Sequence, residues 1–80
     1  MSISAPAKSA TKATDVRFSN EEMIVSLADG RSLSVPLEWF PSLRNATSEQ
    51  RTNWRLIGAG IGIHWEDLDE DISVAALLSS

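Results

Sequence analysis

Strand-like runs follow one another at residues 15–18, 23–27 and 31–35. The first and last alternate polar and apolar residues with the period of two that half-buried strands show, and the middle run continues with β-branched residues. Asp29-Gly30 is a strong hairpin signal, because a tight turn needs a positive φ and glycine adopts it at little cost. With a further turn at Asn20-Glu21, the pattern predicts a three-stranded antiparallel meander.

Proline and capping residues predict short helices in the next part of the chain. Pro36 ends the third strand because it donates no ladder hydrogen bond, and residues 37–40 have room for one helical turn. Thr47 and Gln50 have the spacing of a capping box, in which each side chain bonds the other residue's backbone N–H. We expect this helix to run to about Trp54 and to depend on packing through that side chain.

A second pair of strands is predicted at residues 55–57 and 61–65, around Gly58-Ala59-Gly60. The glycines resemble part of a nucleotide-binding loop, but they lead into a strand instead of a helix, and no Lys-Ser or Lys-Thr follows them. A hairpin is therefore the favoured interpretation. Alternation puts three apolar side chains on one face of its second strand: Ile61, Ile63 and Trp65.

Ser73 is placed to cap a last short helix at residues 74–78. The pattern as a whole predicts an α+β fold: a small antiparallel β meander plus a second short β-hairpin, packed with one or two short helices. Eighty residues allow one domain, whose core supplies only about 3–5 kcal/mol of stability. We expect a disordered leader at residues 1–14, rich in Ser, Ala, Thr and Lys, and a single α+β domain at residues 15–80.

The composition also bears on the cellular compartment. The chain has no cysteine, which leaves no disulfide or thiolate zinc site and suits a reducing cytosol. No apolar run approaches the roughly 18–20 residues that span a bilayer, and the amino terminus lacks the apolar segment of a secretory signal. We therefore expect a cytoplasmic protein that does not bind a membrane.

Negative charge is concentrated near the carboxyl end of the chain, whose formal net charge is −4. Residues 61–80 have no lysine or arginine but contain a run of acids: Glu66, Asp67, Asp69, Glu70 and Asp71. Arg44, Arg51 and Arg55 reverse the balance between residues 41 and 60. An acidic chain with few clustered bases is a poor candidate for binding nucleic acid by itself, since that needs several phosphate contacts from Lys or Arg.

His64, the only histidine, is the natural candidate for a general base beside the carboxylates. No cysteine accompanies it, and no serine has the context of a nucleophile elbow. The alternating aspartates after it resemble the first ligands of a calcium loop, but Ile72 stands where that loop needs glycine and Leu78 where it needs a bidentate glutamate. The sequence thus predicts no catalytic residue, no cofactor and no metal ligand, while weak divalent binding by the carboxylates stays open.

Three tryptophans are many for so short a chain. Trp39 and its neighbour Phe40 are expected to cover one face of the meander together with Leu43. A small domain cannot bury three indoles completely, and tryptophan is enriched in interface hot spots. Trp65, which lies beside the acids, is therefore expected to serve a partner surface.

A combined motif in the second half of the chain resembles that of a known family. It consists of Asn-Trp at residues 53–54, spaced glycines at 58–62, Trp65, and Leu-Asp-Glu-Asp-Ile-Ser at 68–73. On these residues the chain resembles a family of short bacterial proteins, domain of unknown function 2442, over roughly residues 14–78. Glu66 departs from the family, whose members often have proline there.

The resemblance implies a genetic context for the protein but no catalytic activity. The family has no established catalytic residues, and its members are often encoded beside another small uncharacterised protein, in an arrangement like that of a toxin–antitoxin pair. Some longer members carry a helix-turn-helix domain after this one, but this chain has no residues for it after Ser80, so binding to an operator by this chain alone is not expected.

We infer a non-enzymatic protein-interaction module, the antitoxin-like member of a two-protein pair, with a small basic protein as its partner. The candidate interaction surface comprises the acids and their flanking residues: His64, Trp65, Glu66, Asp67, Asp69, Glu70 and Asp71. Leu68 and Ile72 are expected to turn inward and anchor this stretch. Two alternatives stay open, a metal-dependent or acid–base enzyme centred on His64, and a self-associating structural domain such as a homodimer.

Overall fold

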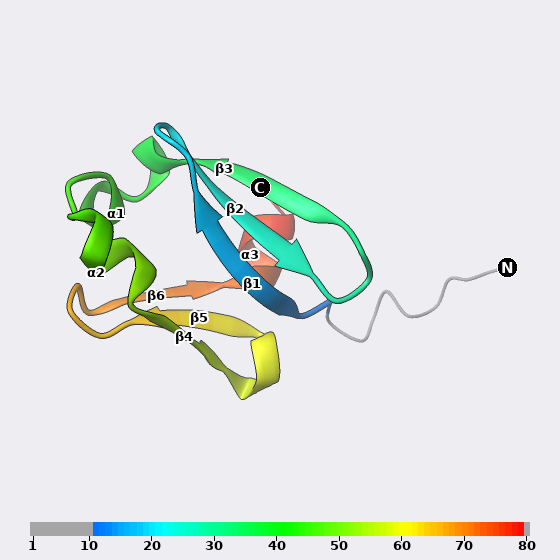
Figure 1. Cartoon of the computed structure of the whole chain (residues 1–80). Coiled ribbons are helices and arrows are strands. Elements are labelled where there is room, and N and C mark those ends of the chain that lie inside the picture. Colours follow the sequence, from blue (N-terminus) through cyan, green and yellow to red (C-terminus); the bar gives the residue numbers. More distant parts are fainter. Residues whose placement is uncertain (1–10, 80) are drawn as a thin grey trace, which may run out of the picture.

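The computed structural model describes residues 11–79, which form two three-stranded antiparallel sheets joined by short helices (Figure 1). The first sheet has the order β1-β2-β3, from Ala13–Phe18, Glu22–Leu27 and Ser32–Pro36. The second has the order β4-β5-β6, from Trp54–Ile57, Gly62–Trp65 and Glu70–Ser73. The helical segments are η2 (Leu37–Trp39), α1 (Pro41–Arg44), α2 (Ser48–Thr52), η3 (Gly58–Gly60) and α3 (Val74–Leu78).

The first sheet is the predicted meander, and the α+β fold class is confirmed. In its central strand, Val25 lies opposite Val16 of β1 and opposite Leu33 of β3. Met23, Val25 and Leu27 are all buried on one face. This is the period of two that a strand imposes when one of its faces packs on a core.

The second sheet has one strand more than the predicted hairpin, because the end of the acidic stretch pairs with β5 as β6. Ile63 of β5 lies opposite Ile72 of β6, and the two side chains are exposed by only 0% and 4%. Ile72 stands between polar neighbours, and its side chain is the buried apolar one of β6. One inward apolar side chain between polar residues is the pattern of a short half-buried strand.

The folded part of the chain begins earlier than the sequence predicts. β1 starts at Ala13 rather than at Asp15, because Ala13 pairs with Leu27 and is buried in the core at 2% exposure. The register of the ladder shifts between Ala13 and Asp15, which hides the regular alternation at this point. Of the predicted disordered leader, residues 1–10 lie outside the described residues.

Both predicted helix caps are present. The Thr47 hydroxyl accepts a hydrogen bond from Gln50 N at 3.0 Å, and the Gln50 side chain accepts one from Thr47 N at 2.9 Å. The Ser73 hydroxyl accepts a hydrogen bond from Ala76 N at 3.3 Å at the start of α3. The capped helix α2 ends before Trp54, because that residue joins β4.

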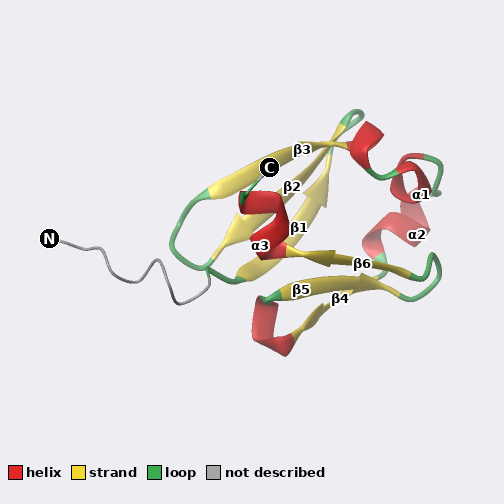
Figure 2. Ribbon diagram, turned by 180° about the vertical axis from the view of Figure 1, so that it is seen from behind, coloured by secondary structure: helices red, strands yellow, loops and turns green. Residues whose placement is uncertain are grey.

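Both sheets and α3 contribute side chains to one hydrophobic core. Figure 2 shows how the two sheets and α3 are arranged. Trp65 of β5 is fully buried at 0% exposure, and its Nε1 donates a hydrogen bond to the backbone oxygen of Arg51 at 2.9 Å. The ring of Phe18 meets it edge-on, with ring centroids 6.5 Å apart. Trp65 therefore ties the second sheet to both β1 and α2.

The glycine run forms the turn η3 between β4 and β5, which confirms the hairpin interpretation. Gly60 has a φ of 113°, and a β-carbon added there would overlap the carbonyl oxygen of Ala13. Ile61 follows in a right-handed helical conformation and is 49% exposed. The prediction that Ile61 shares a face with Ile63 and Trp65 is therefore wrong, because the strand begins only after it.

Candidate functional site

The acidic stretch forms the hairpin between β5 and β6. Trp65 pairs with Glu70, and the intervening turn is closed by hydrogen bonds from Leu68 N to Trp65 O at 3.3 Å and from Asp69 N to Glu66 O at 3.4 Å. Asp69 has a φ of 52°, a left-handed conformation that aspartate adopts more easily than most residues. We name this hairpin, residues 65–71, the acidic hairpin.

Apolar residues anchor the acidic hairpin as the sequence predicts, but they include one that was expected at its surface. Leu68 is partly buried against the core and Ile72 is buried. Trp65 is also buried completely, so the prediction that it serves a partner surface is wrong. The reason is its strand position, since it alternates with His64 and shares the inward face with Ile63.

The exposed tryptophan is Trp39 instead, at 51% exposure in η2. The prediction that it covers a face of the meander is therefore wrong for Trp39, whereas Leu43 is fully buried and Phe40 partly so. A single 3₁₀ turn has its side chains on every side, and Leu37 takes its inward position.

On the outward face of the second sheet, His64 lies between two carboxylates. Its Nδ1 is 2.5 Å from Asp71 Oδ1, and its Nε2 is 3.2 Å from Glu66 Oε1. Arg55 Nη2 in turn lies 3.5 Å from Glu66 Oε1. The ladder brings these groups together, because Arg55 pairs with His64 and His64 pairs with Asp71 across three adjacent strands. We name these four residues the His64 network.

Burial and charge differ within the His64 network. The imidazole is only 15% exposed, whereas both carboxylates and the guanidinium are exposed by about 70%. The hydrogen bond that the ring donates to Asp71 is the main cause that raises the pKa of His64 above its ordinary 6.5, and it outweighs the partial burial of the ring, which lowers the pKa. Protonated His64 therefore has a hydrogen-bond acceptor for each of its ring nitrogens.

The remaining acids of the hairpin differ in what they contact. Glu70 is partly buried and accepts a hydrogen bond from the Ser42 hydroxyl at 2.6 Å, which ties the hairpin to α1. Asp67 accepts one from Asn53 Nδ2 at 3.2 Å and is otherwise exposed. Asp69, at the tip of the turn, is exposed. The stretch is therefore one ordered acidic surface, with Glu70 facing partly inward.

Arg51 and Arg55, which precede the acidic stretch in the chain, have separate roles. Arg55 contacts Glu66 as described, but Arg51 donates from Nε to Leu43 O and from Nη2 to Arg44 O, both at 2.9 Å. Arg51 is therefore a brace between α2 and the end of α1. Its role as a hydrogen-bond donor to two carbonyls has no signal in the sequence, since it depends on where the loop after α1 lies.

The geometry permits limited chemistry at His64. A histidine oriented by a carboxylate is the arrangement of a general base, but the two pockets beside β1 and η2 have neither His64 nor an acid of the hairpin in their walls. Among residues 11–79, no group of three or more His, Asp or Glu side chains is arranged to hold a metal ion. Within the same residues no helix is long and apolar enough to cross a membrane.

Comparisons with known proteins give a family without an assigned activity. The family model described as "Protein of unknown function (DUF2442)" matches residues 13–80. A crystal structure of a protein of unknown function from Rhodospirillum rubrum is 29% identical, with a TM-score of 0.75 over 88% of this chain and 87% of that chain. A solution NMR structure of an uncharacterized protein from Chromobacterium violaceum is 25% identical, with a TM-score of 0.74 over 99% and 85%. No curated protein matches the chain.

Proposed function

This chain belongs to the domain of unknown function 2442 family, and we propose that it is a protein-interaction module whose acidic hairpin binds a basic partner protein. The observation that carries the proposal is an ordered hairpin that presents exposed carboxylates in a segment without lysine or arginine. The exposed acids are Glu66, Asp67, Asp69 and Asp71. Complementary charge of this kind steers a partner to the surface and selects against partners of like charge.

Rigidity of the hairpin supports the same function. Trp65 and Ile72 hold its two strands in the core, and Ser42 holds Glu70 from outside. A surface that is ordered before binding loses less conformational entropy when a partner docks on it. The hairpin can therefore present its charges at fixed spacing to a matching set of lysines or arginines.

The partner that fits this surface is a small basic protein, and the arrangement we propose is a two-gene pair in which this chain is the antitoxin-like member. The proposed site of action is the bacterial cytoplasm. The family resemblance and the acidic surface support this proposal, since an inhibitory partner binds a basic protein most simply by covering its charged surface.

Co-purification with the product of the neighbouring gene tests the proposal directly. We expect a complex whose dissociation constant rises roughly tenfold when Asp67, Asp69 and Asp71 are all replaced by Asn, since each exposed charge pair contributes a few tenths to one kcal/mol. A matched control replaces Glu21, Glu38 and Glu49 by Gln, which removes as much charge from exposed positions elsewhere. Equal affinity of both triple variants, or no complex at all, contradicts the proposal.

The short contact between His64 and Asp71 favours acid–base chemistry as a second candidate. A general base oriented by a carboxylate has this arrangement, and Glu66 at the other ring nitrogen adds a second carboxylate for a divalent ion. Titration with Mg²⁺, Mn²⁺ and Zn²⁺, followed by the NMR signals of the His64 ring, tests this candidate. Unchanged signals at millimolar ion concentration count against it.

Self-association is supported by apolar side chains at the surface. Ile57 and Ile61, at the end of the β4–β5 hairpin, are 40% and 49% exposed, and Trp39 is 51% exposed. Side chains of this size lose solvent contact in a homodimer. Sedimentation at several protein concentrations distinguishes a dimer from a monomer, and a sedimentation coefficient that stays at the value of the monomer excludes this role.

A further inference from the structure

β1 is an edge strand with one unpaired side. In the part of the chain that the structure describes, β1 pairs with β2 and with no other strand. An edge strand has backbone N–H and C=O groups that can pair with a further strand, which is how sheets bind extended peptides.

The hydrogen-bond pattern identifies which groups of β1 point outward. Ser19 N donates to Glu22 O at 2.9 Å, so Ser19 belongs to a bonded pair with β2. Bonded and non-bonded pairs alternate along an antiparallel ladder, which makes Arg17 bonded and leaves Val16 and Phe18 non-bonded. The N–H and C=O groups of Val16 and Phe18 therefore point away from β2.

The ladder on the other side of β2 agrees with this assignment. Leu27 N donates to Arg31 O at 2.8 Å, and Leu37 N donates to Glu21 O at 2.9 Å. The odd-numbered residues of β2 thus bond to β3, and the even-numbered ones bond to β1. Two independent sets of hydrogen bonds give the same register.

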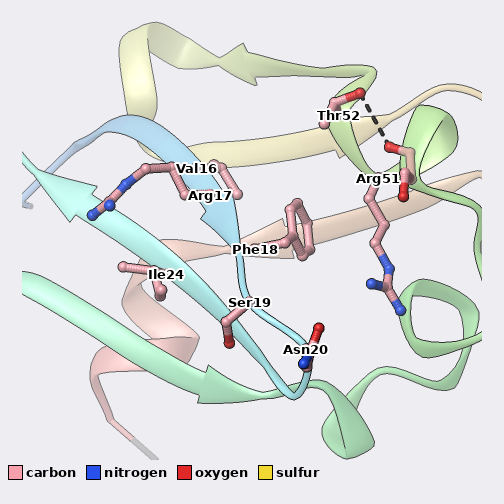
Figure 3. Close-up of a pocket in the computed structure, with 9 residues that line it drawn as sticks. Val16, Arg17, Phe18, Ser19, Asn20, Ile24, Arg51 and Thr52 are labelled. Carbon is pink, nitrogen blue, oxygen red and sulfur yellow. Dashed lines mark hydrogen bonds between the residues drawn. The ribbon is translucent and has the colours of Figure 1, made fainter.

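The open edge of β1 lies beside a groove whose other wall is α2 (Figure 3). The groove has a volume of about 590 Å³ and is lined by Val16, Phe18 and Ile24, by hydroxyl and amide side chains, and by Arg17 and Arg51. The apolar side chains and the unpaired backbone groups together are what an added strand contacts.

The charged residues that line the groove are both arginines, although the chain as a whole is acidic. No carboxylate lines it, and its two arginines lie on the two faces of β1 (Figure 3). The guanidinium of Arg51 is held over the Phe18 ring at 5.8 Å, whereas Arg17 is on the outer face, 60% exposed and 4.0 Å from Asp15. Neighbouring side chains of an added strand also point to opposite faces, so adjacent acids of such a strand would meet one arginine each.

We propose that the edge of β1 binds an extended acidic segment of a partner protein as a fourth strand of the first sheet. Backbone groups of Val16 and Phe18 hold the segment, and Arg17 and Arg51 select its acids. A second copy of β1 is a poorer occupant, because symmetric antiparallel pairing about Arg17 places the two Arg17 side chains opposite each other, and like charges there destabilise a ladder. This surface is distinct from the acidic hairpin and is tested separately.

The experiment uses the full chain labelled with ¹⁵N and an equimolar mixture of acetylated, amidated peptides of about six residues. The peptides have adjacent glutamates at the centre and Val, Ile, Thr or Phe at the other positions. We expect the amide signals of Val16 and Phe18 to shift and their hydrogen exchange to slow. A matched mixture with lysine in place of glutamate should bind more weakly.

Backbone pairing has its own control. Two further peptide mixtures have methyl groups on alternate backbone nitrogens, one mixture on the odd-numbered and the other on the even-numbered residues. In a bound strand one of these two sets of N–H groups faces β1, and the other set faces solvent. We expect one of the two methylated mixtures to lose binding and the other to retain it. If both methylated mixtures still bind, no strand is added to the sheet and the proposal is overturned.

Arginine variants test the charge selection. Arg17→Gln should raise the dissociation constant about twofold to fivefold, as expected for a partly exposed charge pair. Arg55→Gln, at a similarly exposed position on the second sheet, should leave it unchanged. Equal binding of the glutamate and lysine mixtures overturns the proposal, and so does the absence of shifts at Val16 and Phe18 at millimolar peptide. Shifts at these residues that depend on protein concentration without any peptide also overturn it, because they would make a second copy of the chain the occupant.

Discussion

His64 lies among charged groups from β4, from β6 and from the turn that follows β5. Asp71 contacts its Nδ1, Glu66 contacts its Nε2, and Arg55 of β4 contacts Glu66 from the far side. The Asp71 contact is the shorter of the two, at 2.5 Å against 3.2 Å for Glu66, and its hydrogen bond is the largest cause of the raised pKa of His64.

An NMR titration of the His64 ring should give a pKa above 6.5. Asp71→Asn should lower that pKa more than Glu66→Gln does, because the Asp71 contact is the larger cause. The pKa of His64 in the chain unfolded by urea serves as the reference. Equal effects of the two variants would contradict the assignment of Asp71 as the dominant partner.

The raised pKa of His64 makes the free energy of unfolding depend on pH. The folded chain binds the proton more tightly than the unfolded chain, so the stabilisation is fully present below pH 6.5 and is lost as pH rises through the higher pKa of the folded state. We expect the difference in unfolding free energy between the parent and His64→Gln to shrink from pH 6 to alkaline pH, in urea titrations. A difference that stays constant over this range would contradict the expectation.

At the scale of an element, the β4–β5 hairpin depends on close packing against β1. Gly60 has a φ of 113°, and a β-carbon there would overlap Ala13 O and approach Lys12 Cβ to 2.9 Å. Gly30, in the β2–β3 turn, has a similar φ of 97° but has nothing within 4 Å of the same position. The two glycines share the requirement for a positive φ and differ in crowding.

This contrast predicts different effects of alanine at the two glycines. Gly30→Ala should cost about 1–2 kcal/mol, which is the strain of the positive φ alone. Gly60→Ala should cost at least about 2 kcal/mol more, because β1 has to move away from the turn. Urea unfolding of both variants measures the difference, and equal costs would show that the contact between Gly60 and Ala13 is not tight.

The two sheets of the molecule share one core, and Trp65 lies at their junction. It is fully buried, contacts Phe18 of the first sheet and donates a hydrogen bond to Arg51 O. Trp39 is the opposite case, since half of its surface is exposed at 51%. The same residue type therefore holds the molecule together at one position and is available at the surface at the other.

Replacement of each tryptophan by phenylalanine separates these roles. Trp65→Phe should lower the unfolding free energy by about 2–3 kcal/mol, because it leaves space in the core and removes the donor to Arg51 O. Trp39→Phe should change it by no more than about 0.5 kcal/mol. Thermal and urea unfolding of both variants provide the measurement, and a small effect at Trp65 would contradict its place in the core.

Much of this fold follows from local signals in the sequence. Asp29-Gly30 places the β2–β3 hairpin, Thr47 and Gln50 make a capping box, and Ser73 caps the last helix, because each signal acts through neighbouring residues. Ile72 likewise turns inward, as the pattern of one apolar residue between polar neighbours predicts. These interactions close within a few residues, so the order of the chain contains them.

Tertiary structure decided the rest, because the responsible contacts join residues far apart in the chain. Ala13 belongs to β1 through Leu27 and the packing of Gly60, Trp65 is buried beside Phe18, and Arg51 donates to the carbonyl of Leu43. For the acidic stretch, the sequence by itself determined the charge and the apolar anchors. Only the pairing of three strands determined that His64, Glu66 and Asp71 meet on one face while Trp65 turns to the other, since cross-strand neighbours depend on register and not on sequence spacing.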